Sequence, residues 1–248
     1  MSGPASGAQE KLCGVLVVDK PLGWSSMHVC RVVRRAVQRG RGRHKVGHAG
    51  TLDPLATGVV VVCIGKATKQ VNRLMDQAKV YKTTIDLSAF TATDDAELED
   101  EREEVAVEVP PTRQEIEQAL GGMTGTVMQT PPAYSAIHVQ GRRAYQAARA
   151  GESVELQPRP VRIDAMQVLA YTWPTLGLRI TCGKGTYIRS IARDLGKALG
   201  TGGYLTALRR TASGRLNVAM ATPVERFEGR LEQRDLMVFG EQELEAGR

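Results

Sequence analysis

One carboxylate stands out in the stretch HKVGHAGTLDPLATGVVVVCIGKATK, which runs from His44 to Lys69. Asp53 lies between a glycine-containing turn and Pro54, five residues after His48, and an apolar run follows at once. Pro54 fixes its own φ and biases Asp53 towards extended backbone, so the aspartate is constrained on both sides. Local chemistry fits two roles for Asp53: a turn cap, or a nucleophilic or acid–base carboxylate in a basic cleft. A nearby arginine would keep such a carboxylate ionised at neutral pH.

Other common catalytic arrangements find little support in the motifs. The GKAT and GKGT segments, which begin at Gly65 and Gly183, lack the glycine spacing and the GK[ST] ending of a phosphate-binding P-loop. The four histidines show neither HExxH nor other metal-ligand spacing, so we expect no metal site. A Ser–His–Asp arrangement stays open, although no GxSxG motif accompanies it. No CxxC pair is present, and we expect buried thiols at Cys13, Cys30, Cys63 and Cys182.

The charge of the chain is unevenly distributed. The 248 residues carry a net charge of +6, yet the segment from Asp94 to Glu104 holds eight acids and one base. That segment therefore carries −7 and the rest of the chain +13, which indicates a polyanionic partner such as nucleic acid. The alternative is a basic surface that serves only solubility. We expect a solvated acidic loop at about 92–108, and phosphate contacts from the basic loop at 38–48.

Length and hydropathy indicate a globular chain. Hydrophobic residues make up 42% of the sequence, enough for one large domain with a substantial core. The longest apolar run, Val59 to Ile64, has the length of a strand and not of a membrane span. The first residues are small and polar and lack the apolar centre of a signal peptide, so we expect a flexible tail at 1–11 and a cytoplasmic protein with no membrane partner.

Hydrophobic periodicity predicts both strands and helices along the chain. The elements do not alternate as regular βαβ units, so we predict an α+β fold with a mixed, largely antiparallel sheet and packed helices. Strands are expected at 14–18, 57–65, 79–90 and 176–182, and helices after Ser25 or Ser26 and at 67–78, 111–122 and 188–199.

Local signals mark several helix ends. Thr112 and Glu115 form a capping-box pattern, and Gly121 suits a left-handed position at the end of that helix. The segment 133–151 indicates a strand, a glycine turn and a short helix. In the last helix the apolar stripe leaves Arg189 on another face, close to the preceding glycine turn.

Six blocks in collinear order resemble the TruB family of tRNA pseudouridine-55 synthases. The resemblance covers roughly residues 12–215. The blocks are GVLVVDKPLGWSS, KVGHAGTLDPLATGVVVVCIGKATK, KVYKTTI, QTPPAYSAIHVQGRRAYQAARAGE, CGKGTYIRSIARDLG and YLTALRRTASG. The resemblance implies a pseudouridine synthase-like catalytic fold and an isomerase that needs no cofactor.

The resemblance assigns a role to each matched residue. Asp53 would be the essential aspartate that attacks the target uridine, at the ribose C1′, at a ribose proton or at the ring. Tyr81 would stack on the base and Tyr187 would pack beside it, as rings suit a flipped-out nucleobase. Leu208 would form an apolar wall, and Arg189 would pair with Asp53.

Two further residues support this assignment. His48 would fill the gap that the flipped uridine leaves in the T-loop, because chemistry on a stacked base requires extrusion first. Lys20, in the first block with Pro21 and Gly23, would be structural or would face a phosphate.

The sequence also departs from the family. The acidic TDTxD pattern reads TATDD here, with Ala92 at a usual aspartate, and His138 stands where a lysine is common. We expect a catalytic domain at 12–215 and a short C-terminal extension at 216–248, which is too short for the PUA domain that bacterial members usually carry.

The function implied is isomerisation of uridine 55 in the T-loop of tRNA, with the T-arm as partner and a monomer as the working form. Assistance with tRNA folding is compatible with this activity. The alternative from another class is a non-catalytic protein that binds and folds tRNA, for which the basic surface and His48 would suffice. Asp53 is the feature that separates the two.

Overall fold

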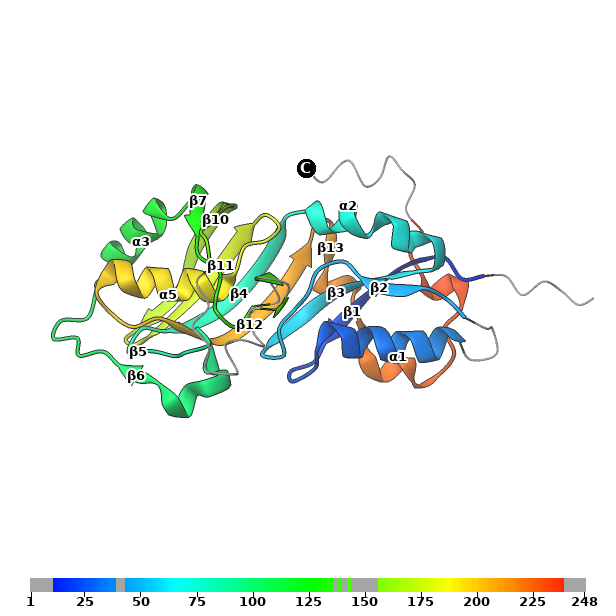
Figure 1. The fold of residues 1–248 in the computed structure, drawn as a ribbon, viewed down its shortest axis with the longest axis horizontal. Coiled ribbons are helices and arrows are strands. Elements are labelled where there is room, and N and C mark those ends of the chain that lie inside the picture. The colour runs from blue at the N-terminus through cyan, green and yellow to red at the C-terminus, as the bar shows by residue number, and fades with distance from the viewer. Residues whose placement is uncertain (1–10, 39–42, 136–137, 140–141, 144–155, 239–248) are drawn as a thin grey trace, which may run out of the picture. The chain divides into compact units, whose positions relative to one another are not determined.

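The computed structural model describes residues 11–38, 43–135, 138–139, 142–143 and 156–238. The chain divides into two compact units, each described by itself below. Unit 1 comprises residues 1–76 and 213–248, and unit 2 comprises residues 77–212. In Figure 1 unit 1 is mostly blue, cyan and red, and unit 2 is mostly green and yellow.

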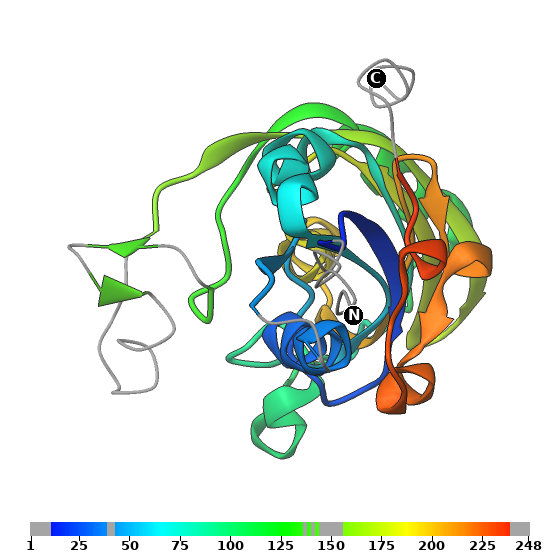
Figure 2. The ribbon, with the colours of Figure 1, turned by 90° about the vertical axis from the view of Figure 1, so that its right-hand side faces the viewer.

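Two long paired strands form the centre of unit 1. β1 (Gly14–Lys20) pairs antiparallel with β3 (Ala56–Ile64), and the short β2 (Val46–His48) pairs antiparallel with β3. β14 (Thr222–Pro223) comes from the end of the chain and pairs parallel with β1, so the orange-to-red segment runs beside the blue strand in Figure 2. A core cluster of this unit consists of buried apolar side chains: Val15, Val17, Ala49, Val59, Val61, Cys63, Ala67, Leu74 and Leu216.

Helices complete unit 1. α1 (Ser26–Gln38) begins where expected, because the Ser25 Oγ accepts a hydrogen bond from the His28 N–H at 3.1 Å. The helix expected at 67–78 is instead the 3₁₀-helix η1 (Gly65–Gln70) followed by α2 (Val71–Asp76). The residues after β13 (Leu216–Asn217) form three short 3₁₀-helices: η3 (Val218–Met220), η4 (Val224–Glu228) and η5 (Gln233–Asp235).

Gly65 explains where the chain leaves β3. Its φ is +64°, and a Cβ there would overlap the Leu12 carbonyl oxygen. Only glycine fits this left-handed, closely packed position. The Thr68 hydroxyl then donates to the Gly65 carbonyl at 2.8 Å, which stabilises a tight first turn.

Unit 2 contains five consecutive strands of sheet, in the order β12–β4–β11–β10–β7. Neighbouring strands pair antiparallel from β4 to β7. Their bounds are β4 (Lys79–Asp86), β7 (Gly125–Gln129), β10 (Arg159–Thr172), β11 (Thr175–Cys182) and β12 (Tyr204–Ser213). The antiparallel pairing confirms the expected α+β class.

Two helices pack beside these strands. α3 (Arg113–Gly122) contacts both β10 and α5 (Ile188–Leu199), and Figure 1 shows the two helices next to each other. The expected capping box is confirmed, because the Thr112 side chain accepts from the Glu115 N–H while the Glu115 carboxylate accepts from the Thr112 N–H. At the end of α5 the C-cap residue is a left-handed glycine, Gly200, whose φ is +68°.

The expectation for Gly121 was wrong. α3 continues through Gly122 and ends on Met123, whose φ of −102° is not left-handed. The Met123 N–H and the Thr124 hydroxyl both donate to the Leu120 carbonyl, at 3.1 and 2.9 Å. Since these bonds already satisfy the last turn, no left-handed residue is needed.

The acidic segment is more ordered than expected. η2 (Ala96–Glu101) lies between β5 (Ala89–Phe90) and β6 (Glu103–Glu104), which pair with each other. Asp94 and Asp95 are buried, at 8% and 2% exposure, so the expected solvated loop was wrong for its first two acids. The reason is local charge: both carboxylates meet arginines of α5.

Other expectations concern single elements. β8 (His138–Val139) and β9 (Arg142–Arg143) pair with each other, whereas the helix expected to end at Gly151 lies outside the described residues. All four cysteines are free thiols, and those at 30, 63 and 182 are buried. In the part of the chain that the structure describes, no helix has the length and apolarity to cross a bilayer.

Candidate active-site residues

The Asp53 turn lies in unit 1 between β2 and β3. The Asp53 carbonyl accepts from the Ala56 N–H at 3.1 Å, and its side chain is half-buried. Just before it, the Ser26 Oγ accepts from the Leu52 N–H at 2.7 Å and donates to the Leu52 carbonyl at 3.2 Å. The buried Ser26 thereby fixes the residue that precedes Asp53.

Lys20 supports the same turn from the other side. Its side chain is fully buried, and its Nζ donates to the carbonyls of Pro21, Trp24 and Pro54 at 3.0, 2.6 and 3.4 Å. The Pro54 carbonyl also accepts from the Gly23 N–H at 2.9 Å. The burial of Lys20 favours the structural role over contact with a phosphate.

Two histidines near this turn differ in their surroundings. His48 ends β2 opposite Val62 and is half-buried. His44 is buried, and its Nε2 accepts from the Leu12 N–H at 3.2 Å, which indicates a structural role. The role of His48 as a wedge in the T-loop stays a prediction.

Tyr81, Leu208 and Tyr187 lie in unit 2. Tyr81 is in β4 opposite Ile180, and Tyr81 and Leu208 each have only 8% of their surface exposed. Tyr187 directly precedes α5 as its N-cap residue. Each place is compatible with the expected role in base binding, which stays a prediction.

Gln129 and Arg159 hold Tyr187, and sequence reasoning had assigned no role to either residue. The buried Gln129 amide accepts from the Tyr187 N–H at 2.8 Å and donates to the Tyr187 carbonyl at 3.1 Å. The Arg159 guanidinium lies 5.1 Å from the centre of the Tyr187 ring and donates to the Gly185 carbonyl at 2.8 Å. This places a cation over the ring face, a favourable arrangement that also restricts the ring.

Arg189 is buried in the first turn of α5, with 5% of its surface exposed. It donates to the carbonyls of Thr93 and Tyr134 at 3.1 and 3.0 Å, and its Nε lies 3.6 Å from an Asp95 carboxylate oxygen. Arg189 is therefore a buried cation and not a surface one. The expected pairing of Arg189 with Asp53 stays a prediction.

A second ion pair lies one helical turn further along α5. Arg193 donates to the Asp94 carboxylate at 2.8 Å. Burial raises the pKa of the Asp94 carboxyl to about 6, and the charges of Arg193 and Arg189 oppose that shift. The i, i+4 spacing of the two arginines was the sequence signal for this pair, but it does not name their partners.

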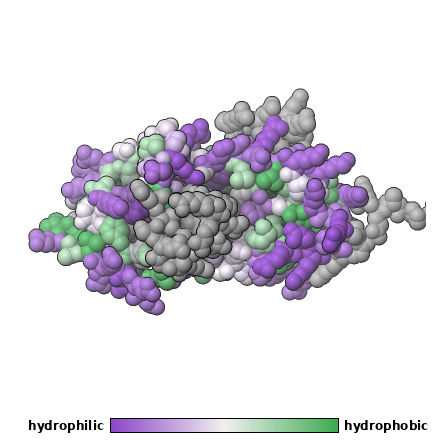
Figure 3. Space-filling view, viewed as in Figure 1, coloured by the Kyte–Doolittle hydropathy of each residue, from purple (hydrophilic) through white to green (hydrophobic). Residues whose placement is uncertain are grey.

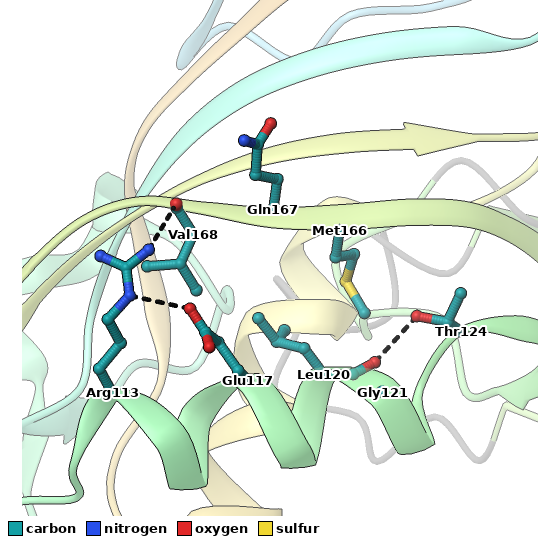
Figure 4. Close-up of a pocket in the computed structure, with 8 residues that line it drawn as sticks. All are labelled: Arg113, Glu117, Leu120, Gly121, Thr124, Met166, Gln167 and Val168. Atoms are coloured by element: carbon teal, nitrogen blue, oxygen red, sulfur yellow. Dashed lines mark hydrogen bonds and ion pairs between the residues drawn. The ribbon is translucent and has the colours of Figure 1, made fainter.

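A hollow of about 360 Å³ lies elsewhere in unit 2, between α3 and β10. Figure 4 shows Arg113 at its edge, bonded to Glu117 and to the Val168 carbonyl. None of the predicted site residues lines it. Among the described residues, no three His, Cys, Asp or Glu side chains are grouped as metal ligands.

Basic side chains are displayed on α1. Arg31 and Arg35 are exposed, and Figure 3 shows hydrophilic side chains over the part of unit 1 in which Figure 1 places α1. Arg43 is also exposed, whereas the centre of the basic loop expected to contact phosphates, at 39–42, lies outside the described residues.

The fold belongs to a known class. It is similar to a chain in the "Crystal Structure of a Cbf5-Nop10-Gar1 Complex", with 27% identity and a TM-score of 0.64 over 86% of this chain and 52% of that chain. A chain in the "Structure of H/ACA RNP bound to a substrate RNA containing 2'-deoxyuridine" is similar at 26% identity and a TM-score of 0.61, over 86% and 51%. The chain thus spans about half the length of these solved relatives.

Sequence comparison defines the family. Residues 35–188 match the N-terminal domain of TruB family pseudouridylate synthases, and residues 189–236 match the tRNA pseudouridylate synthase B C-terminal domain. The chain therefore belongs to the TruB family of pseudouridylate synthases, which are isomerases, and the predicted catalytic fold is confirmed. The domain limits expected at 11/12 and 215/216 stay a prediction.

Relatives that match this chain over most of their own length agree with this assignment. The chain is 42% identical over 224 residues to "tRNA pseudouridine synthase B" of Phocaeicola vulgatus, covering 90% of this chain and 94% of that protein. It is 45% identical over 227 residues to the protein of the same name from Thermobifida fusca, covering 86% of this chain and 73% of that protein.

Proposed function

We propose that the protein is a tRNA pseudouridine synthase that isomerises uridine 55 in the T-loop of tRNA. Family membership and the names of its relatives support the reaction and the tRNA substrate. The observation that carries the proposal is the Asp53 turn. Its flanking residues are fixed by Ser26 and Lys20, so one carboxylate is held in a defined backbone position.

Asp53 is the residue proposed to attack the target nucleoside. Overall, the bond between N1 and the ribose C1′ breaks, a bond between C5 and C1′ forms, and the hydrogen on C5 is replaced by one on N1. Nothing is oxidised or reduced, so no cofactor is needed. A rigidly held carboxylate suits this chemistry, because the detached uracil must be met again in a fixed geometry.

The remaining residues are proposed to receive the base. Extruding a nucleotide from its stack costs a few kcal/mol, which stacking on aromatic rings partly offsets. Tyr81 and Tyr187 provide the rings, Leu208 an apolar wall, and His48 the side chain that fills the vacated place in the T-loop. Arg189 is proposed to keep Asp53 ionised.

The direct test uses an unmodified tRNA transcript. Wild-type protein should form pseudouridine at position 55 alone, whereas Asp53→Asn should form none and still bind the transcript. Asp53→Asn is the matched variant because it retains the size of the side chain and removes only its charge and nucleophilicity. A wild type that yields no pseudouridine, or an Asp53→Asn variant that remains fully active, would contradict the proposal.

A second candidate function is tRNA folding without modification. The exposed arginines of α1 favour it, because they give unit 1 a basic face suited to phosphates. The two functions are compatible in one monomeric cytoplasmic protein. Refolding of a misfolded tRNA transcript by Asp53→Asn, at the wild-type rate, would establish this second activity separately from catalysis.

A further inference from the structure

Two arginines on successive turns of α5 make parallel sets of contacts. Arg189 bonds the Thr93 and Tyr134 carbonyls and pairs with Asp95. Arg193 bonds the Thr130 carbonyl at 2.8 Å and pairs with Asp94 at 2.8 Å. Each guanidinium thus connects α5 to the same two chain segments, 93–95 and 130–134.

Neither connected segment belongs to a helix or a named strand, although Asp95 forms an isolated β-bridge with Leu205. Residues 91–94 lie between β5 and η2, and residues 130–135 follow the end of β7. The backbone of the 93–95 segment is held by the Leu205 N–H, which donates to the Asp94 carbonyl at 3.1 Å, and the side-chain contacts add further restraints on its position. Asp94 also has a φ of +58°, a left-handed conformation that Asp and Asn tolerate better than most residues but that must be held in place.

We propose that Arg193 and Asp94 are positioning residues of the isomerase: their ion pair holds the 93–95 segment on α5, so that Asp95 remains paired with Arg189. This inference rests on the proposed function and deepens it, because Arg189 is the arginine assigned to the site. Neither Arg193 nor Asp94 is expected to touch the substrate.

The Arg189–Asp95 pair and the Arg193–Asp94 pair differ in burial. The Arg189 and Asp95 side chains are 6% and 3% exposed, whereas those of Arg193 and Asp94 are 15% and 11% exposed. The Arg193–Asp94 pair has partial access to water, so its loss should leave the fold intact. Arg193 lies one turn after Arg189 on α5, and Asp94 directly precedes Asp95 in the 93–95 segment. Loss of the Arg193–Asp94 pair should therefore alter the position of Asp95.

The charged surroundings of Asp94 provide a distinguishing readout. The groups that act on it are Arg189, Arg193 and Asp194 of α5, and Asp95 is its neighbour in the chain. Because the pKa of the Asp94 carboxyl is raised to about 6, the ion pair weakens as pH falls through that value. A residue that only stabilises the fold would not transmit this titration to the rate of the reaction.

The experiment measures single-turnover pseudouridine formation and tRNA affinity in Arg193→Gln, Asp94→Asn and the double variant. We expect each single variant to lower the rate about 10- to 100-fold, as small misplacements at a site can, with affinity within about threefold of wild type. Both changes remove the Arg193–Asp94 pair, and Arg193→Gln also removes the contacts of the guanidinium with Thr130 and Asp194. Arg193→Gln should therefore be the slower single variant, and the double variant should be no slower than Arg193→Gln. Arg193→Lys should restore part of the rate.

The pH profile gives the second readout. The wild-type rate should rise with pH through about 6, and this rise should be absent in Asp94→Asn. The matched control is Glu117→Gln, which breaks an exposed ion pair in the same unit, with Arg113 at 2.8 Å. It should leave both the rate and the pH profile unchanged.

The outcomes separate this inference from the proposed function. Wild-type protein without product would overturn the proposed function. Active wild type with an unchanged rate in Arg193→Gln and Asp94→Asn, or additive losses in the double variant, would overturn the positioning role alone. If Arg193→Gln does not fold, Asp94→Asn decides, because asparagine retains the shape and the tolerance for positive φ.

Discussion

The turn that carries Asp53 and the segment that carries Asp95 are irregular backbone held by different kinds of contact. The Asp53 turn in unit 1 is held by Lys20, whose ammonium donates to the carbonyls of Pro21, Trp24 and Pro54, and by Ser26. The Asp95 segment in unit 2 is fixed by two arginines and two aspartates. The first support includes hydrogen bonds to backbone carbonyl and N–H groups, and the second includes two ion pairs.

The difference has consequences for stability and for regulation by pH. The carbonyl groups that accept from Lys20 and the N–H that donates to Ser26 do not change their charge between pH 4 and pH 7. Buried ion pairs bring a desolvation penalty that can exceed their attraction, and they titrate when one partner accepts a proton. The Asp53 turn should therefore be the rigid region, and the Asp95 segment the adjustable one.

The largest effect is expected at Lys20. Replacing it in Lys20→Met leaves three partly buried carbonyl bonds without their charged donor, which should lower the free energy of unfolding by about 3 kcal/mol. Denaturant unfolding of Lys20→Met and of the control Lys66→Met, whose lysine is exposed in the same unit, measures the difference. Equal stability of the two variants would show that Lys20 does not hold the turn.

An intermediate effect is expected from the titration of Asp94. Its pKa in the folded protein is raised to about 6 by burial, so folding favours the protonated form. The stabilising contribution of that proton is present below the ordinary pKa near 3.8 and is lost as pH rises through about 6.

The stability of wild type relative to Asp94→Asn should therefore fall by on the order of 2 kcal/mol between pH 4 and pH 7. The difference between the two proteins cancels the carboxylates that they share. If the difference in unfolding free energy between wild type and Asp94→Asn stays constant from pH 4 to pH 7, the Asp95 segment does not differ from the Asp53 turn in its response to pH.

The smallest effect is expected at Ser26. Ser26→Ala leaves the buried Leu52 N–H without its acceptor, at a cost of about 1 kcal/mol. Product formation should fall more than stability does, because the unfixed N–H precedes Asp53. Thermal unfolding and single-turnover assays on one preparation compare the two losses, and an unaltered rate would place Ser26 outside the support of the turn.

Local sequence signals predicted the local parts of the structure. The capping box at Thr112, the helix start at Ser25 and the apolar strand before Gly65 depend on residues within a few positions of each other. The constrained backbone at Asp53 was predictable for the same reason, since Pro54 acts on its direct neighbour.

Contacts between distant residues were not predictable from these signals. Gln129 and Tyr187 are 58 positions apart, and Asp94 and Arg193 are 99 positions apart. The charge pattern alone favoured a solvated acidic loop, because it does not show that two arginines of a later helix meet the first two acids. The prediction of a left-handed Gly121 was wrong for a local reason. The Thr124 hydroxyl donates to the Leu120 carbonyl, so the end of α3 needs no left-handed residue.

The central claim is that one rigidly held carboxylate carries out the isomerisation. Site-resolved mapping of pseudouridine in an unmodified T-loop RNA, treated with equal amounts of wild type and Asp53→Asn, tests it most directly. The account predicts conversion at position 55 by the wild type and none by the variant, at equal RNA binding. Conversion by Asp53→Asn at the wild-type level would contradict it.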